Sequence, residues 1–327
     1  MRLFVADTVP DTFLQELSDR GHEALYRPLL TSEELKDALA GVEILVVRST
    51  RVTREALDAA DALRLVVRGG SGTNTIDCEA AAERGIYVCN VPGRNAVAVA
   101  ELAVGLLIAL DRRIPDNVAD LRAGRWDKKR YATGQGILGR RVGVVGLGSV
   151  GLAFAERAAA LGATVYAVAK PDRSPDVRDR ARAIGVHFVD DVGTLAETCD
   201  VLSFHVPGAE TTRGLVGREL LARVQPGAIV LNTARAEIVD DAALIEAMDT
   251  KGVRVGIDVF GEEPGTSTGT IDSPLARHPN VYGTHHIGAS TAQAQDAIVA
   301  EVLRMIEAFE RGEVLHCVNL QGSLNRG

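Results

Sequence analysis

One segment of the chain indicates its architecture. Residues 141–161 read RVGVVGLGSVGLAFAERAAAL, where an apolar run leads directly into Gly146, Gly148 and Gly151 and then into an amphipathic stretch. The first glycine permits a tight turn, the second lets the backbone approach a pyrophosphate, and the third lets a helix pack closely on a strand. The start of such a helix presents N–H groups and a partial positive charge to phosphates. The segment predicts a dinucleotide site; the alternative is a glycine turn without a ligand.

The strand that follows this helix bears on the identity of the dinucleotide. An acidic residue about 20 positions after the glycines commonly holds the ribose hydroxyls of NAD. Here residues 164–168 lead into Ala169 and Lys170, and no acid occurs before Asp172. Lys170, with Arg173 nearby, either accepts the 2′-phosphate of NADP or is an ordinary loop charge. We therefore expect NAD or NADP as the cofactor.

Short apolar runs alternate with stretches of helical period on both sides of this segment. The predicted strands are residues 3–6, 44–47, 65–67 and 86–90 in a first series, and 142–145, 164–168, 187–189, 201–205, 229–232, 253–257 and 280–282 in a second. The predicted helices of the first series are residues 12–20, 33–39, 53–60 and 78–84. This alternation is typical of an α/β fold with parallel sheets. We expect two doubly wound, Rossmann-like sheets with a cleft between them.

The 327 residues suggest two domains, at roughly 150 residues per domain. A long apolar helix at residues 96–112 can pass from one sheet to the other, and a closing helix at 291–311 can pass back. We therefore expect a discontinuous substrate domain, residues 1–97 and 288–327, and a dinucleotide-binding domain, residues 98–287.

Composition narrows the range of partners. The formal charge is −8 with no long basic run to offset it, so nucleic acid is not an expected partner. The most apolar stretch is 102–110, far short of the roughly 20 residues that a membrane span needs, and the apolar run in the first residues is too short for a signal peptide. The four cysteines form no C-x-x-C pair, which predicts neither a disulfide framework nor a metal site and favours a cytoplasmic location.

Several motifs in a fixed order resemble those of the D-isomer-specific 2-hydroxyacid dehydrogenases. They are VRST at 47–50, VRGGSGTNTID at 67–77, NVPGRNAVAVAE at 90–101, VGLGSVG at 145–151, HVPGAETTRGLVG at 205–217, NTARAEIVD at 232–240, GIDVFGEEP at 256–264 and THHIGAST at 284–291. Because these motifs extend over nearly the whole chain, the resemblance is specific. It implies a small 2-oxo or 2-hydroxy acid as substrate and a homodimer built mainly through the cofactor domain.

The resemblance assigns roles to individual residues. Arg235 matches the substrate-binding arginine, His286 the catalytic acid and base, and Glu263 the carboxylate that partners it, with Glu262 as a rival. Further substrate-binding positions are Arg48, Ser49, Arg68, Gly70 and Ser71, where the backbone of Gly70 and Ser71 matches the group that holds the substrate carboxylate. The cofactor-binding positions are Gly146, Gly148, Ser149, Val150, Gly151, Lys170, His205, Val206, Pro207, Thr212, Thr233, Ala234, Asp258 and Gly288.

Chemistry independently suits the three catalytic candidates. The planar fork of an arginine matches a carboxylate and polarises a neighbouring carbonyl, and a histidine titrates near neutrality. Alternatively, Arg235 is a surface charge, His286 a core histidine and Asp258 a cap of the loop that follows it. Arg48, Arg51 and Arg68 lie near ends of predicted strands, where they either hold a phosphate or only solubilise the chain.

The phosphoglycerate dehydrogenases are the most similar branch, in their short form without a regulatory domain. This rests on the VRS segment, on Arg68 and on GRW at 124–126. The chain departs from the family at Ala169, at Ala236, at His285 and in the length of the VRST segment. Two alternatives stay open: a glyoxylate or hydroxypyruvate reductase with the same catalytic groups, and a dinucleotide-sensing binding protein resembling a co-repressor.

Overall fold

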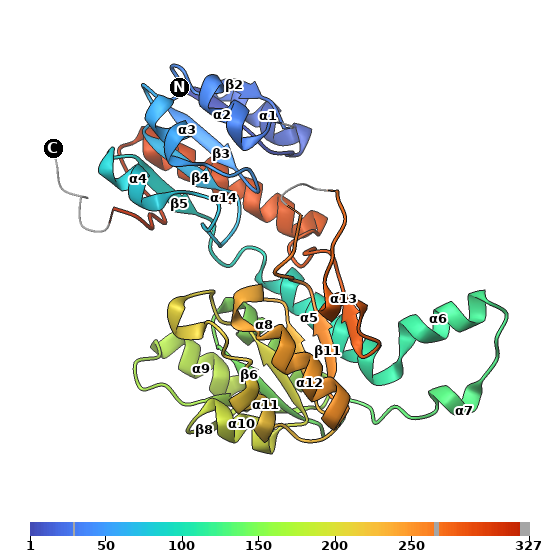
Figure 1. Ribbon diagram of the computed structural model, residues 1–327. Helices are drawn as coiled ribbons and strands as arrows, with labels where there is room; N and C mark the ends of the chain where they lie inside the picture. Colours follow the sequence, from blue (N-terminus) through green and yellow to red (C-terminus); the bar gives the residue numbers. More distant parts are fainter. Residues whose placement is uncertain (29, 265–267, 321–327) are drawn as a thin grey trace. The chain divides into compact units, whose positions relative to one another are not determined.

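The structure is a computed structural model that describes residues 1–28, 30–264 and 268–320 (Figure 1). The chain divides into two compact units. The first unit joins Met1–Asn95 to the residues from Thr291 onward, and the second unit is Ala96–Ser290. Each unit is built around one parallel sheet, and each is described separately below.

The first unit has a five-stranded sheet in the order β2-β1-β3-β4-β5, and all paired strands are parallel. Its elements are β1 (Arg2–Val5), α1 (Asp11–Asp19), β2 (Glu23–Tyr26), α2 (Ser32–Ala38), β3 (Ile44–Val47), α3 (Arg54–Ala59), β4 (Leu65–Arg68), α4 (Cys78–Glu83), β5 (Tyr87–Asn90) and α14 (Ala292–Glu310). Helices α2, α3 and α4 cover one face of this sheet, and α1 and α14 cover the other.

The second unit has a seven-stranded parallel sheet in the order β12-β11-β10-β9-β6-β7-β8. Its strands are β6 (Arg141–Val145), β7 (Thr164–Val168), β8 (His187–Val189), β9 (Val201–Phe204), β10 (Ile229–Asn232), β11 (Arg254–Ile257) and β12 (Val281–Gly283). Its helices are α5 (Ala96–Arg112), α6 (Ile114–Arg122), α7 (Lys128–Tyr131), α8 (Ser149–Ala160), α9 (Pro175–Ile184), α10 (Val192–Thr198), α11 (Arg218–Arg223), α12 (Asp241–Lys251) and α13 (Pro274–Arg277), with short 3₁₀ turns at Glu210–Thr212 and Ala236–Ile238. The strand order reverses between β6 and β9, and ligands of such sheets bind at the carboxyl edge beside this reversal.

Burial explains why the strands form where they do. All residues of β3, β9 and β10 are buried, as expected of parallel strands covered on both faces by helices. Helices α5, α8 and α9 cover one face of the second sheet, and α10, α11 and α12 cover the other. The expectation of two doubly wound parallel sheets is therefore confirmed. The elements that were not predicted from the sequence include β2, α6 and α7.

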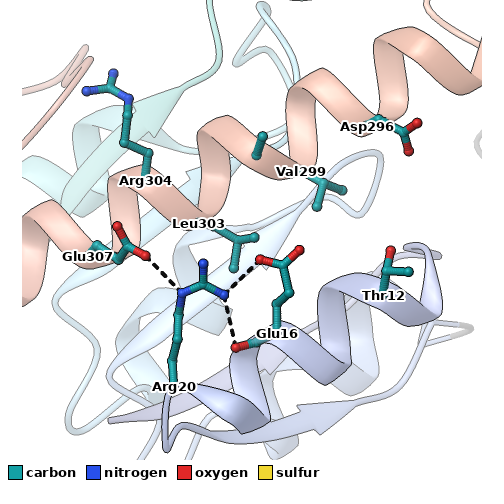
Figure 2. Close-up of a pocket in the computed structure, with 9 residues that line it drawn as sticks. Thr12, Glu16, Arg20, Asp296, Val299, Leu303, Arg304 and Glu307 are labelled. Carbon is teal, nitrogen blue, oxygen red and sulfur yellow. Dashed lines mark hydrogen bonds and ion pairs between the residues drawn. The ribbon is translucent and has the colours of Figure 1, made fainter.

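Helices α1 and α14 pack side by side, and a hollow lies between them (Figure 2). The Arg20 guanidinium donates to the carboxylates of Glu16 and Glu307, in each case at 2.8 Å. Since these ion pairs face water, they add little stability, and the buried side chains of Leu17 and Val302 hold the two helices to the sheet. Of the polar side chains drawn in Figure 2, Arg20, Glu16 and Glu307 thus neutralise one another.

Helix α5 ends where Arg113 takes a left-handed backbone conformation, φ 51°. From there α6 and α7 extend away from the sheet of the second unit (Figure 1). We call residues 114–131 the arm. None of the described helices combines the length and the apolar character that crossing a membrane demands.

Candidate active site

The turn after β6 has the shape of a phosphate cradle. Gly146 has φ +98°, and a Cβ there would lie 2.6 Å from the carbonyl oxygen of His205. A Cβ at Gly151 would overlap the carbonyl oxygen of Gly146, whereas one at Gly148 would enter open space. Gly148 is also the N-cap of α8, and no side chain caps that end of the helix. Open space beside uncapped N–H groups fits a bound pyrophosphate, so these residues fit a dinucleotide.

The end of β7 presents little side-chain chemistry of its own. Ala169 and Lys170 are both exposed. Arg173 turns back toward the strand: its Nη2 donates to the carbonyl oxygen of Val168 at 2.9 Å, and its guanidinium carbon lies 5.3 Å from the centroid of the Phe188 ring. Burial lowers the pKa of Arg173. Of the two basic residues at this strand end, only Lys170 extends its charge into solvent.

His205 follows β9 at the carboxyl edge of the sheet. Its Nε2 lies 2.8 Å from the hydroxyl oxygen of Ser203, and its ring packs at 5.1 Å from the ring of Phe154. Burial lowers the pKa of His205 to about 3, so the imidazole is neutral near pH 7. The side chain beyond it, Val206, packs over Gly146. His205 therefore supports the glycine turn and is not a proton donor.

A short turn follows this strand and is closed by a threonine. The Thr212 hydroxyl donates to the carbonyl oxygen of Pro207 at 2.7 Å and accepts from the N–H of Ala209 at 3.0 Å. Pro207 is exposed, so the turn presents its backbone to solvent.

A second turn presents Arg235, and Asn232 shapes it. The buried Asn232 amide accepts from the N–H of Ala234 at 3.0 Å and donates to the carbonyl oxygen of Arg235 at 2.9 Å. Among the described residues, the buried hydroxyl of Thr233 has no hydrogen-bond partner. The Arg235 guanidinium donates to the carbonyl oxygen of Ala234 at 2.6 Å. The turn thus holds an arginine whose other N–H groups are available to an anion.

His286 and Glu263 form a direct pair. The Nδ1 of His286 lies 2.7 Å from Oε2 of Glu263, and Oε1 of Glu263 accepts from the N–H of Phe260 at 2.8 Å. Burial favours a raised pKa for Glu263, but these two hydrogen bonds and the nearby Arg235 charge outweigh it, and the pKa is lowered. An ionised carboxylate therefore holds one nitrogen of the imidazole. Of the two adjacent glutamates, Glu263 and not Glu262 makes this contact.

Asp258 fixes the loop that carries His286. Its buried carboxylate accepts from the hydroxyl of Thr284 at 2.6 Å and from the N–H groups of Ile287 and Gly288, both at 2.9 Å. Its carbonyl oxygen accepts from the N–H of His286 at 2.8 Å. His286 has φ +52°. This left-handed conformation is unfavourable for any residue other than glycine, and it persists only where the surrounding structure enforces it. The hydrogen bonds of Asp258 hold the backbone of His286 in this conformation.

In the first unit, Asp7 organises the VRST segment. One oxygen of its carboxylate accepts from the N–H groups of Arg48, Ser49 and Thr50 at 2.6, 3.0 and 3.1 Å. The sequence interpretation did not include Asp7. Its only signal in the sequence is a polar residue just beyond β1, and the strand order is needed to place it against the end of β3.

The glycine loop after β4 lies beside this segment, since β3 and β4 pair. The Arg68 guanidinium lies over Gly70, where a Cβ would overlap it. The N–H of Gly70 donates to the carbonyl oxygen of Arg68 at 2.8 Å, while the N–H of Ser71 has no acceptor among the described residues. The side-chain amide of Asn90 donates to the carbonyl oxygen of Ser71 at 2.6 Å. The loop is held from β5 and presents the Ser71 N–H.

The structure therefore brings the predicted site residues together in two groups. Arg235, Glu263 and His286 gather in the second unit with the glycine turn and Asp258. Arg48, Ser49, Arg68, Gly70 and Ser71 lie at the ends of adjacent strands in the first unit. No group of three or more His, Cys, Asp or Glu side chains within residues 1–28, 30–264 and 268–320 is placed to hold a metal ion.

Comparison with known proteins gives consistent matches. A family model described as "D-isomer specific 2-hydroxyacid dehydrogenase, NAD binding domain" matches residues 104–288. The chain is 38% identical over 317 residues to D-3-phosphoglycerate dehydrogenase of Methanocaldococcus jannaschii, covering 96% of this chain and 58% of that protein. It is 37% identical over 309 residues to hydroxypyruvate reductase of Thermotoga maritima, covering 93% of this chain and 97% of that protein.

A solved structure extends the comparison. The crystal structure of an NADPH-dependent glyoxylate/hydroxypyruvate reductase from Sinorhizobium meliloti, in complex with NADP and malonate, matches with a TM-score of 0.79 and 28% identity, covering 97% of this chain and 96% of that one. The chain thus spans little more than half of the first relative and nearly all of the other two.

Proposed function

The chain belongs to the D-isomer-specific 2-hydroxyacid dehydrogenases, and on that premise we propose that it transfers a hydride between a nicotinamide cofactor and a D-2-hydroxy acid/2-oxo acid pair. The observation that carries the proposal is the 2.7 Å contact between His286 and Glu263 beside Arg235. In this proposal the second unit binds the cofactor and supplies the catalytic groups, and the first unit contributes further substrate contacts.

The glycine turn and α8 hold the pyrophosphate of the cofactor through backbone N–H groups. Thr233 and Ala234 line the same carboxyl edge, where the buried Thr233 hydroxyl offers a hydrogen bond. The cofactor supplies or accepts the hydride when bound. Because Ala169 offers no carboxylate to repel a 2′-phosphate and Lys170 adds a positive charge, we propose that NADP is accepted as well as NAD.

Proton transfer falls to His286. In reduction, Nε2 of His286 gives a proton to the oxygen that was the carbonyl, and in oxidation it takes that proton back. Glu263 holds Nδ1, which fixes the tautomer and stabilises the charged ring while it exists. Arg235 binds the carboxylate of the substrate and polarises its 2-oxo group, where negative charge develops. Asp258 acts one step away, by holding the loop of His286.

The first unit selects the rest of the substrate. We propose that Ser71 N–H contributes to the carboxylate site and that Arg48 and Arg68 face an anionic tail. A phosphorylated substrate, 3-phosphoglycerate or phosphohydroxypyruvate, fits these charges and the name of the first relative. Two observations favour a smaller substrate. The guanidinium of Arg68 lies over Gly70 and takes up space there, and the chain covers almost all of a relative named hydroxypyruvate reductase.

A substrate panel separates these candidates. The rate of cofactor oxidation is measured with NADH and NADPH against glyoxylate, pyruvate, hydroxypyruvate and phosphohydroxypyruvate. If Arg68 holds a phosphate, Arg68→Ala lowers kcat/KM for phosphohydroxypyruvate by about tenfold or more and leaves glyoxylate nearly unchanged. An equal loss for both substrates contradicts a phosphate site. A chain that binds a dinucleotide but reduces none of these acids contradicts the enzymatic proposal.

We further propose that the protein is a cytoplasmic homodimer assembled through the second unit. The arm carries Ile114, Val118 and Leu121 at helical spacing, exposed by 45, 38 and 55%, and Trp126 exposed by 81%. Apolar side chains exposed together on a helix mark a contact surface. Light scattering should give twice the chain mass, and Leu121→Glu should give the monomer mass with intact folding. A wild-type monomer at micromolar concentration contradicts the proposal.

A further inference from the structure

Two cysteines face each other at the edge of the first sheet. After α14 the chain returns to β5 and runs antiparallel to it: the N–H of Val318 donates to the carbonyl oxygen of Val88 at 2.9 Å, and the N–H of Asn90 donates to the carbonyl oxygen of His316 at 3.3 Å. Between these two hydrogen bonds Cys89 is paired with Cys317. We call residues 316–319 the return segment.

The backbone geometry of this pair suits a covalent bond. Because the flanking residues make the ladder bonds, Cys89 and Cys317 occupy a non-hydrogen-bonded position, where the Cα atoms of an antiparallel pair lie about 4.5 Å apart. Disulfides span Cα separations of about 4.4–6.8 Å. The two side chains are close enough to influence each other electrostatically, and both are free thiols in the structure. From this geometry we infer that Cys89 and Cys317 form a reversible disulfide that fastens the return segment to β5.

Two side chains of the return segment also hold it in place: His316 contacts Glu301 of α14, and Asn319 contacts β5. The Asn319 amide accepts from the N–H of Val88 at 2.8 Å, donates to the carbonyl oxygen of Ile86 at 2.8 Å, and accepts from the thiol of Cys317 at 3.3 Å. Asn319 therefore sets the register that keeps Cys317 opposite Cys89. A one-residue slip would turn the Cys317 side chain to the other face of the sheet.

The other two cysteines are placed differently. Cys78 is the first residue of α4 and is not paired with Cys317 through the backbone. Its thiol is nevertheless close enough to the Cys317 thiol for the two to influence each other. Cys199 follows α10 in the second unit and is buried beside Gly143. Cys78 is thus the competitor to test, and Cys199 is the natural control.

The oxidation is a thiol–disulfide exchange with a low-molecular-weight disulfide. Cys317 is half-buried, whereas only 1% of Cys89 is exposed, so Cys317 is the thiol that meets the reagent. Its thiolate attacks one sulfur of the reagent, whose S–S bond breaks and releases one small thiol. Sγ of Cys89 then loses its proton and attacks Sγ of Cys317, and a second small thiol leaves. Two protein thiols are oxidised while one small disulfide is reduced to two thiols.

Burial should make the second step the slower one. Desolvation raises the pKa of Cys89 well above its ordinary value, so its thiolate is rare near neutral pH. The bond would therefore form under sustained oxidation and not in a reducing cytoplasm. Once formed, the bond closes a loop that contains the whole second unit and helix α14. It also fastens β5, whose Asn90 side chain donates to the carbonyl oxygen of Ser71. We expect the unfolding temperature of the oxidised protein to rise by several degrees.

The experiment treats the reduced, folded chain with oxidised glutathione and counts thiols under denaturing conditions. We expect the count to fall from four to two, peptide mapping to join Cys89 to Cys317, and a dithiol reductant to restore all four. Cys199→Ser should form the same bond. Cys89→Ser should stop at one glutathione on Cys317, because the resolving thiol is missing.

Two results would overturn the inference. One is a wild-type chain that keeps four thiols, or only accumulates glutathione adducts, under conditions that oxidise a dithiol reagent. The other is a map that joins Cys78 to Cys317. Both readouts are covalent and made on the wild-type protein, so they do not depend on a variant that folds or on any catalytic activity.

Discussion

Two carboxylates, the half-buried Asp7 and the buried Asp258, show how single residues shape the site. Asp7 gathers three N–H groups of the VRST segment, and Asp258 gathers two N–H groups and a hydroxyl of the loop that carries His286. Neither contact follows from sequence spacing, because each joins segments far apart in the chain. The sequence does place Asp258 at the end of a strand, and one interpretation of it, as a cap of the following loop, describes the contacts that the structure shows. Its role in binding the cofactor stays a prediction.

The adjacent glutamates provide a matched pair of variants. Glu263→Gln keeps the shape of the side chain and removes the charge opposite His286, so the charged ring loses its stabilising partner. We expect kcat for 2-oxo acid reduction to fall by about 10², within the range for general acid catalysis. Glu262→Gln should stay within about twofold of wild type. Steady-state kinetics with a saturating cofactor measures both, and equal effects at the two positions would contradict the role of Glu263.

Ala169 provides a test of cofactor preference. An aspartate there would accept hydrogen bonds from the ribose hydroxyls of NAD and repel the 2′-phosphate of NADP. Ala169→Asp should therefore shift the ratio of kcat/KM toward NADH by about tenfold or more. Lys170 should change the wild-type ratio of kcat/KM for NADPH and NADH only slightly, because salt screens an exposed charge. A wild type with a strong preference for NADH that the variant leaves unchanged would show that other groups recognise the ribose.

At the scale of elements, two glycines of the turn after β6 have different roles: Gly148 leaves room for a phosphate, and Gly151 allows close packing. Gly148→Ala places a methyl group in open space beside the N-terminus of α8, so the fold should be kept while the approach of a pyrophosphate is blocked. We expect the Kd for the cofactor to rise by at least tenfold with an unchanged Tm. Gly151→Ala, in contrast, should lower Tm, since its Cβ would overlap the carbonyl oxygen of Gly146.

Calorimetric titration and thermal unfolding distinguish these two variants. If Gly148→Ala binds the cofactor as tightly as wild type, the turn does not hold a pyrophosphate. If it loses binding and stability together, the loss has a structural cause and says nothing about the phosphate.

The predictability of an element follows from its burial. Strands such as Ile44–Val47, Thr164–Val168 and Ile229–Asn232 are mainly apolar, and the sequence predicts them with their observed bounds. Strand β2 reads EALY and lies at the sheet edge with no buried residue, so its composition gives no strand signal. Helix α6 escaped prediction because it begins at the left-handed Arg113 and buries only Asp120. The local sequence pattern thus predicts the strands of the core and misses exposed elements such as β2 and α6.

At the scale of the molecule, the last helix and the last residues complete the first unit. Glu301 of α14 is buried and accepts from Arg94 at 2.7 Å, from Arg304, and from Nε2 of His316 at 3.0 Å. Glu301 therefore joins Arg94, near the end of the N-terminal part of the first unit, to His316 of the return segment. The hydrogen bond from Arg304, together with those from Arg94 and His316, outweighs burial, which alone would raise the pKa, and lowers the pKa of Glu301 from 4.5 to about 2.

This cluster predicts a loss of stability in acid. The pKa of Glu301 is lower in the folded than in the unfolded chain, so its stabilisation is complete above about pH 4.5 and is lost as the pH falls to about 2. Glu301→Gln should lower the free energy of unfolding by about 2 kcal/mol at pH 7. Urea unfolding at pH 7 and at pH 3 measures the difference between wild type and variant. A difference that stays the same at both pH values would contradict the contribution of the ionised carboxylate.

The central claim is that His286 transfers the proton in the reduction of a 2-oxo acid to the D-isomer. The most direct measurement compares wild type and His286→Ala with hydroxypyruvate and a reduced nicotinamide cofactor, following cofactor oxidation, cofactor affinity and the configuration of the product. The account predicts a D-product, a kcat lower by about 10²–10⁴ in the variant, and an unchanged cofactor Kd. Near-normal turnover of His286→Ala, or an L-product from the wild type, would contradict it.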